Sequence, residues 1–352
     1  MNFGIIANDD FFKTSSRYIA RQIAGKLIEA QHEVFVFNKT LFSVNIPNTK
    51  PIKVEGLLSK LFTRNLFEQS TIKALQKQHG IDRVLVFDVD DILKTKIPQT
   101  LILNSNQTFS TDALERLKSL DGIVTFSETK KKELIDLKPD LSGKILISGM
   151  PVEDGVKAFS YNEKLAAKEQ FAQEKEYFVF TDFELDEERF LNLLKAFSTF
   201  KKMLQTNCKL VVYLRSGFVA KELEEILKPL SNFKYRTDVN IINDHNDGAL
   251  YECLSGAYAH ISTTENVVFN LPVLEVLLCG VPSVARNSAT TAKYSEAVLE
   301  ISNSSPESIA EKMIFLYKNE SLRSRLSQNA EELTLGYNRD SNLIELVSLI
   351  VR

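Results

Sequence analysis

The sequence predicts an α/β protein with two doubly wound parallel sheets, and three observations support this fold class. The chain of 352 residues is too long for a single domain with one hydrophobic core, and its length suits two domains of roughly 150 to 180 residues each. Short apolar strands alternate with amphipathic helices along both halves of the chain. Each strand–helix–strand unit requires a parallel crossover, because the helix returns the chain to the end of the sheet where the first strand began.

The first half opens with such a unit. Residues 3–7 are apolar enough for a buried strand, a polar loop follows, and apolar residues recur at helical spacing over 17–30 before a second strand at 33–37. Further strands are expected at 83–91, 100–105 and 121–127, and residues 144–155 are expected to form a last strand followed by a Gly/Pro turn. We therefore predict a first Rossmann-like domain over residues 1–155.

The second half repeats the alternation. Strands are expected at 177–183, 209–217, 240–244, 260–264 and 282–286, and the intervening helices at 189–204, 219–230 and 248–257. We predict a second Rossmann-like domain over residues 156–335 and a last helical segment over 336–352.

The charge and the apolar content of the chain argue against a nucleic-acid-binding or membrane-spanning protein. Lys and Arg total 43 against 46 Asp and Glu, and a net charge of −3 gives no electrostatic footprint for nucleic acid. The first residues, MNFGIIANDD, lack the basic and apolar regions of a signal peptide. No stretch approaches the length of about 18 apolar residues that spans a bilayer. We expect a cytoplasmic protein with no transmembrane segment and no nucleic-acid partner.

The most informative stretch is 262–282, STTENVVFNLPVLEVLLCGVP. It has a glutamate in a polar segment, then Leu-Pro, then an apolar helix start with a second glutamate, then Gly-Val-Pro. This block resembles the donor-sugar signature of GT-B glycosyltransferases of family 4 (glycosyl transferases group 1). The helix and strand at 15–37 resemble the family's first domain, and the tail after Tyr337 resembles the last helix, which crosses back to that domain.

The resemblance implies a GT-B fold, in which two Rossmann-like domains face each other across a cleft. It also implies a hexosyltransferase-type enzyme that is metal-independent and retaining, with a nucleotide sugar, UDP- or GDP-linked, as donor substrate and no cofactor. The acceptor would be a glycan, a lipid-linked acceptor or a protein.

The same resemblance implies roles within the block. Glu275 matches the glutamate that receives the nucleotide's ribose hydroxyls, a role for which a carboxylate is suited because it accepts two hydrogen bonds. The helix dipole alone also favours a glutamate there. Glu265 would be the displaced first glutamate, a candidate catalytic residue near the donor sugar. Asn266 and Asn270 would replace the family's two glycines, and Phe269 and Leu271 complete the donor-binding set.

A donor site must also supply positive charge to balance the negative diphosphate. The family's Arg and Lys positions fall on Phe183 and Glu188 here. A metal-free site needs arginine, lysine or amide groups to stabilise the departing diphosphate. Arg189 and Arg215 are the candidate donor-binding cations, and Arg286 is a further source of charge. An ordinary solvated acidic loop is the competing interpretation of residues 184–189.

On the acceptor side, the family often has a histidine near position 105. Here Asn106 is the candidate, and it can hydrogen-bond a hydroxyl but cannot accept a proton at neutral pH. Asn8, Ser15 and Ser16 form the candidate acceptor-side loop, although the two serines also suit the N-cap of the following helix.

A metal site is not expected. FDVDD at 87–91 contains the Asp-x-Asp pattern that binds a divalent cation in the other glycosyltransferase fold, but a solvated turn at a strand end is favoured. The four histidines show no metal-ligand spacing.

A second function class stays open. Several positions that carry charge in the family hold other residues in this chain, and their combined replacement favours a loss of catalytic activity. The alternative is a catalytically degenerate GT-B protein, a possible pseudoenzyme that binds a glycan or regulates a partner glycosyltransferase.

Overall fold

The computed structural model describes residues 1–8, 11, 14–38, 46–53, 79–105, 109–183, 185–215, 220–243, 247–265 and 267–352. The chain divides into two compact units. The first comprises Met1–Pro151 together with Asn338–Arg352, and the second comprises Val152–Tyr337. The predicted domain boundaries, after residues 155 and 335, lie near these divisions.

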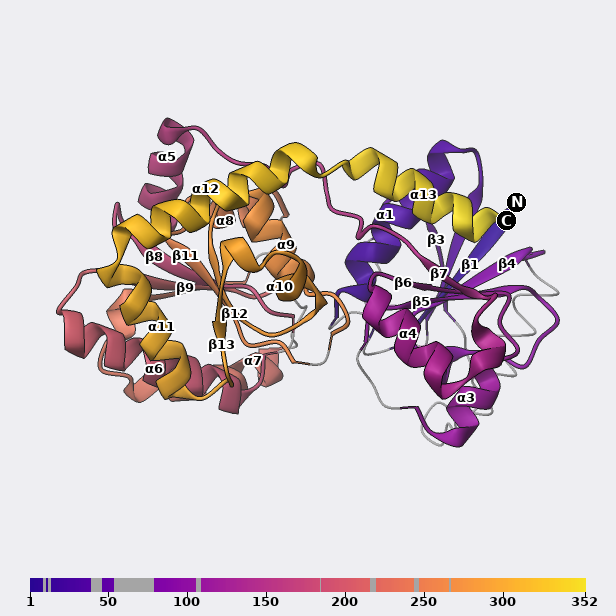
Figure 1. Ribbon diagram of the computed structural model, residues 1–352, viewed down its shortest axis with the longest axis horizontal. Helices are drawn as coiled ribbons and strands as arrows, with labels where there is room; N and C mark the ends of the chain where they lie inside the picture. Colours follow the sequence, from indigo (N-terminus) through magenta and orange to yellow (C-terminus); the bar gives the residue numbers. More distant parts are fainter. Residues whose placement is uncertain are drawn as a thin grey trace. The chain divides into compact units, whose positions relative to one another are not determined.

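The first unit contains a parallel sheet with the strand order β3-β2-β1-β4-β5-β6-β7 (Figure 1). Its strands are β1 (Asn2–Ala7), β2 (Glu33–Asn38), β3 (Lys50–Lys53), β4 (Arg83–Val86), β5 (Gln99–Leu103), β6 (Gly122–Thr125) and β7 (Ile145–Ile147). The central strands are buried on both faces, as expected for a parallel sheet covered by helices.

Helices cover both faces of this sheet. They are α1 (Ser16–Glu29), α3 (Thr111–Leu117), α4 (Glu128–Leu137) and α13 (Arg339–Val351). The final helix, α13, packs against α1 and belongs to the first unit. The approach is close, because a Cβ added at Gly149 would lie 2.2 Å from the side chain of Asn342 in α13.

The second unit contains a parallel sheet with the order β10-β9-β8-β11-β12-β13. Its strands are β8 (Tyr177–Phe180), β9 (Lys209–Tyr213), β10 (Val239–Ile242), β11 (Ala259–Ser262), β12 (Ser283–Arg286) and β13 (Val298–Ile301). The two parallel sheets confirm the predicted fold class.

Helices α6, α7 and α11 cover one face of the second sheet, and α5, α8, α9 and α12 cover the other (Figure 1). Their bounds are α5 (Tyr161–Ala172), α6 (Glu187–Leu204), α7 (Ala220–Leu227), α8 (Asp247–Ser255), α9 (Leu271–Leu278), α10 (Ala289–Lys293), α11 (Pro306–Lys318) and α12 (Glu320–Gly336). Phe190, Phe197 and Phe200 of α6 recur at helical spacing and are fully buried against the sheet. This apolar stripe is the face of α6 that packs against the sheet.

Three predictions about strands need correction. The strand expected over 83–91 ends at Val86, because Asp88 caps a 3₁₀ turn over Val89–Asp91 by accepting a hydrogen bond from the Asp90 amide. The edge strands β3 and β13 were not expected from the sequence. Both are four residues long and contain charged residues, so they lack the apolar run that identifies the central strands.

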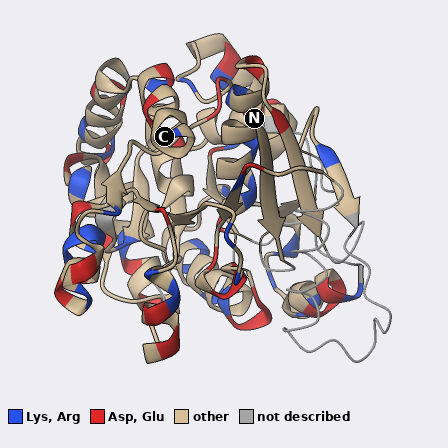
Figure 2. Cartoon of the chain, turned by 90° about the vertical axis from the view of Figure 1, so that its right-hand side faces the viewer, with Lys and Arg blue, Asp and Glu red and all other residues tan. Residues whose placement is uncertain are grey.

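Lys and Arg residues are interspersed with Asp and Glu over the helices (Figure 2). Among the described helices, none combines the length and apolarity needed to cross a bilayer.

Candidate functional site

The candidate site lies at the carboxyl edge of the second sheet. Chain order runs outward from β8 through β9 to β10 on one side, and from β11 through β12 to β13 on the other. The topological switch point is therefore between β8 and β11. In open α/β sheets, ligands bind beyond the carboxyl ends of the strands at such a point. The segments that follow β8, β9, β11 and β12 hold most of the candidate residues.

Asp182 bridges the switch point. It follows β8, and its carboxylate accepts hydrogen bonds from Ser262 Oγ at 2.6 Å and from the Thr263 amide at 2.6 Å, both at the end of β11. Burial raises the pKa of Asp182, and the hydrogen bonds from Ser262 and Thr263 oppose that rise. Asp182 was not among the site residues predicted from the sequence, although an acid shortly after an apolar strand is a usable signal.

Helix α9 begins beside this bridge. Asn270 caps it, because its Oδ1 accepts a hydrogen bond from the Val273 amide at 3.2 Å. Asn270 Nδ2 donates to Ser262 Oγ at 2.9 Å, which links the cap to the Asp182 network. Phe269, Asn270 and Leu271 are all buried. In this structure Asn270 caps the start of α9, and the donor-binding role of all three residues stays a prediction.

Glu275, in the second turn of α9, is paired with Arg215, which follows β9. Glu275 Oε1 accepts a hydrogen bond from Arg215 Nη2 at 3.0 Å, and Oε2 accepts one from Nη1. The side chains are 1% and 0% exposed, respectively. The two residues that the sequence assigned separately to the ribose and to the diphosphate thus contact each other.

Phe183 and His260 lie near Arg215. The guanidinium carbon of Arg215 lies 4.4 Å from the centre of the Phe183 ring, a cation–π contact. His260 is fully buried, and its ring nitrogens lie 3.2 Å from Thr181 Oγ1 and 3.0 Å from Ser283 Oγ. Burial, assisted by the charge of Arg215, lowers the pKa of His260 to about 3. His260 is therefore neutral at pH 7.

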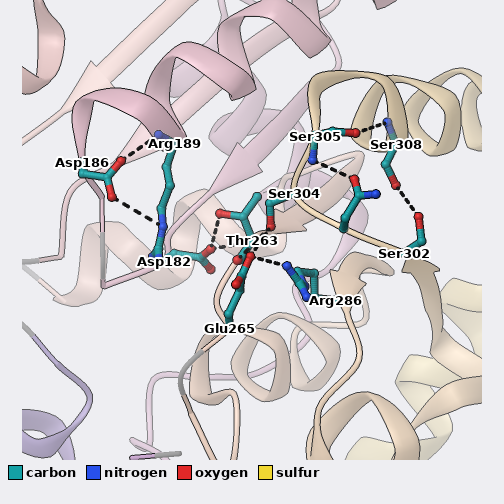
Figure 3. A network of polar contacts seen from close by, with 11 residues as sticks. Asp182, Asp186, Arg189, Thr263, Glu265, Arg286, Ser302, Ser304, Ser305 and Ser308 are labelled. Carbon is teal, nitrogen blue, oxygen red and sulfur yellow. Dashed lines mark hydrogen bonds and ion pairs between the residues drawn. The ribbon is translucent and has the colours of Figure 1, made fainter. Parts of the chain in front are cut away.

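A second ion pair at this edge is accessible to solvent. Glu265 follows β11 and pairs with Arg286 at the end of β12, and Ser304 Oγ donates to Glu265 Oε1 at 3.1 Å (Figure 3). The Glu265 side chain is 41% exposed and that of Arg286 is 28% exposed. This pair offers an acid and a cation together beside the switch point.

Arg189 lies in the first turn of α6. Asp186 caps this helix by accepting a hydrogen bond from the Arg189 amide at 2.7 Å, and its carboxylate lies 3.6 Å from Arg189 Nε (Figure 3). Glu188, at the family's lysine position, is exposed on the same turn. Part of the charge of Arg189 is thus balanced within its own helix.

In the first unit, the acceptor-side residues form local contacts at the carboxyl edge of that sheet. Ser15 Oγ accepts a hydrogen bond from Asn104 Nδ2 at 2.9 Å and does not cap α1. Asn8 Nδ2 donates to Asp91 Oδ2 at 2.8 Å, and Ser16 is the first residue of α1. Asn8 and Ser15 both lie in the segment between β1 and α1, at the carboxyl edge of the sheet, where ligands of open α/β sheets bind.

Two candidates, Asn106 and Asn266, lie outside the described residues. Of the Asp-x-Asp pattern, Asp88 caps the 3₁₀ turn, whereas Asp90 is exposed. Within the described ranges, no group of three or more His, Cys, Asp or Glu residues could hold a metal ion.

Residues 161–333 match the sequence model of the family described as glycosyl transferases group 1. No curated protein matches the chain. Among solved structures, the chain is similar to a glycosyltransferase from Rickettsia africae, with 12% identity, a TM-score of 0.73 and coverage of 100% of this chain and 98% of that one.

It is also similar to HepE from Anabaena in complex with UDP-glucose, with 10% identity, a TM-score of 0.74 and the same coverage. WaaG, a glycosyltransferase involved in lipopolysaccharide biosynthesis, is 14% identical, with a TM-score of 0.74 and 99% of both chains covered. These likenesses extend over both units and confirm the predicted GT-B fold.

Proposed function

The second unit of this GT-B chain belongs to glycosyl transferases group 1, and on this basis we propose that the protein transfers a sugar from a nucleotide-diphosphate sugar to a glycan, a lipid-linked acceptor or a protein. The donor is UDP- or GDP-linked. HepE, one of the similar structures, was solved with UDP-glucose and with UDP and glucose, which supports a uridine nucleotide as the first donor to test. The reaction retains the configuration of the anomeric carbon and needs no metal ion.

The observation that carries this proposal is the accessible Glu265–Arg286 pair at the carboxyl edge. As the bond between sugar and diphosphate breaks, negative charge develops on the departing diphosphate, and fixed cations lower the barrier if they meet that charge. Arg286 is accessible and is oriented by Glu265. Glu265 is held in turn by Ser304, which leaves its second carboxylate oxygen for a sugar hydroxyl.

The test measures both binding and turnover. We expect UDP or GDP and the matching sugar nucleotides to raise the melting temperature of the wild-type protein. Donor hydrolysis or transfer should fall by about 100-fold in Arg286→Ala and Glu265→Gln, since such contacts act chiefly in the transition state. The melting temperature should change little, because an exposed ion pair contributes about 0–1 kcal/mol.

A matched control is Glu33→Gln, which removes an exposed ion pair with Lys50 at the start of β2. This variant should keep full turnover. Equal loss of turnover in Glu33→Gln, or full turnover in Arg286→Ala, would contradict the assignment of the pair.

One observation favours the second candidate, a catalytically degenerate partner of an active glycosyltransferase. Arg215 occupies both oxygens of Glu275 inside the protein, while Phe183 and Glu188 stand at the positions of the family's cations. Wild-type protein that neither binds nor hydrolyses any UDP or GDP sugar at millimolar concentration would favour this candidate. Its own test is direct titration against an active group 1 glycosyltransferase, with the partner's turnover as the readout.

A further inference from the structure

The buried contact between Arg215 and Glu275 occupies the atoms that the proposed donor needs. Glu275 presents two carboxylate oxygens, and each accepts a hydrogen bond from a different terminal nitrogen of Arg215. The ribose of a nucleotide presents two neighbouring hydroxyl groups, which donate in the same side-by-side manner. Because Glu275 is only 1% exposed while the guanidinium group lies against it, the ribose diol and the guanidinium group compete for the same space beside this carboxylate.

The arrangement makes an exchange of donors feasible. Breaking a buried ion pair is costly when either charge is left without a partner, so the exchange is feasible only for a ligand that supplies a new partner to each of the two groups. A hydroxyl pair from the ribose keeps both oxygens of Glu275 hydrogen-bonded when Arg215 leaves. The released guanidinium keeps its charge and requires a new anion.

The diphosphate of the same ligand supplies that anion. Arg215 lies two residues after β9, which is next to the switch-point strand β8, and Phe183 after β8 covers its guanidinium with an aromatic face. His260, which lies nearby, is neutral at pH 7 and adds no charge of its own. A planar guanidinium matches the paired oxygens of a diphosphate by forming two parallel hydrogen bonds.

We propose that Arg215 is an exchangeable latch on the nucleotide site, released from Glu275 by the ribose of the donor and transferred to the donor's diphosphate. This inference rests on the proposed function, because it concerns the same donor site. It adds a specificity rule. A nucleoside must break the ion pair without giving Arg215 a new partner, whereas a nucleoside diphosphate replaces the contact that it breaks. The site therefore selects diphosphates over nucleosides.

The test is calorimetric titration with uridine, UDP, guanosine and GDP, supported by ligand-observed NMR for weak binding. Arg215→Met removes the latch and the phosphate contact together. For the base that binds, the nucleoside should bind about threefold tighter or more, since the latch no longer reduces the competent fraction. The diphosphate should bind about tenfold weaker or more, because a charge-assisted hydrogen bond is lost.

Two further variants separate these effects. Arg215→Lys keeps the charge but loses the two-pronged contact, so the nucleoside should bind tighter while the diphosphate stays within about threefold of wild type. It also serves if Arg215→Met fails to fold. Glu275→Gln should weaken binding of both ligands, because an amide presents one acceptor oxygen in place of two.

The control is Lys201→Met. It breaks the ion pair with Asp238, at 2.8 Å, in which Lys201 is 6% exposed and which lies next to the start of β10, at the opposite edge of the sheet. Nucleotide affinity should not change. Opposite shifts of nucleoside and diphosphate affinity in Arg215→Met, together with tighter nucleoside binding alone in Arg215→Lys, support the latch. Parallel shifts, or none, overturn the latch while leaving the proposed function intact. Wild-type protein that binds neither UDP nor GDP overturns both.

Discussion

Breaking the Arg215–Glu275 pair from one side should destabilise the second unit strongly, whereas replacing both partners should not. Both side chains are almost fully buried, so Glu275→Leu leaves a buried arginine without its carboxylate, and Arg215→Met leaves a buried carboxylate without its cation. Each single variant should cost about 3–5 kcal/mol. In the double variant neither charge remains, and its stability should lie near that of wild type or above it.

The assay is differential scanning calorimetry of the four proteins in a double-mutant cycle. The second unit, Val152–Tyr337, is of a size for which each kcal/mol corresponds to roughly 2–4 °C. Each single variant should thus melt roughly 6–20 °C lower. Additive losses in the double variant would refute the reasoning, because they would show that the two side chains stabilise the unit independently and not as a pair.

Two further predictions concern stability. Gly280→Ala should cost about 1–2 kcal/mol, because Gly280 has φ +73° where the α9 end is closed by hydrogen bonds from the Gly280 amide to Leu277 and from the Val281 amide to Val276. Urea denaturation measures this, and the control Gly25→Ala, which adds a Cβ that meets nothing within 4 Å inside α1, should not destabilise. His260 predicts a pH dependence: its pKa is lowered to about 3 in the folded state, so the unfolded chain binds a proton that the folded one does not. Stability should therefore fall as pH drops below about 6.5, with a slope approaching 1.4 kcal/mol per pH unit, and His260→Gln should lose this contribution between pH 6.5 and 5. An unchanged slope in that variant would show that His260 is not the group responsible.

The succession of strands and helices was readable from the sequence, because it depends on local periodicity. Apolar strands alternate with amphipathic helices, and each such unit forces a parallel crossover whatever its distant neighbours are. The signature at 262–282 located the carboxyl-edge segment and the start of α9 in the same way, since Asn270, Leu271 and Pro272 form a helix start within a few residues. The edge strands β3 and β13 were not predicted from the sequence, because the four residues of each carry no such local pattern.

The partners of the site residues were decided only by the tertiary structure. Arg215 and Glu275 are 60 positions apart, and Asp182 and Thr263 are 81 apart, so no local spacing relates them. From the sequence, Arg215 and Glu275 were predicted to be two independent ligand contacts. Strand order brings the end of β9 toward the start of α9, and once both charges are removed from water each is stabilised chiefly by the other. Local sequence thus determines which residues end each strand, whereas the packing of the sheet determines which of those residues meet.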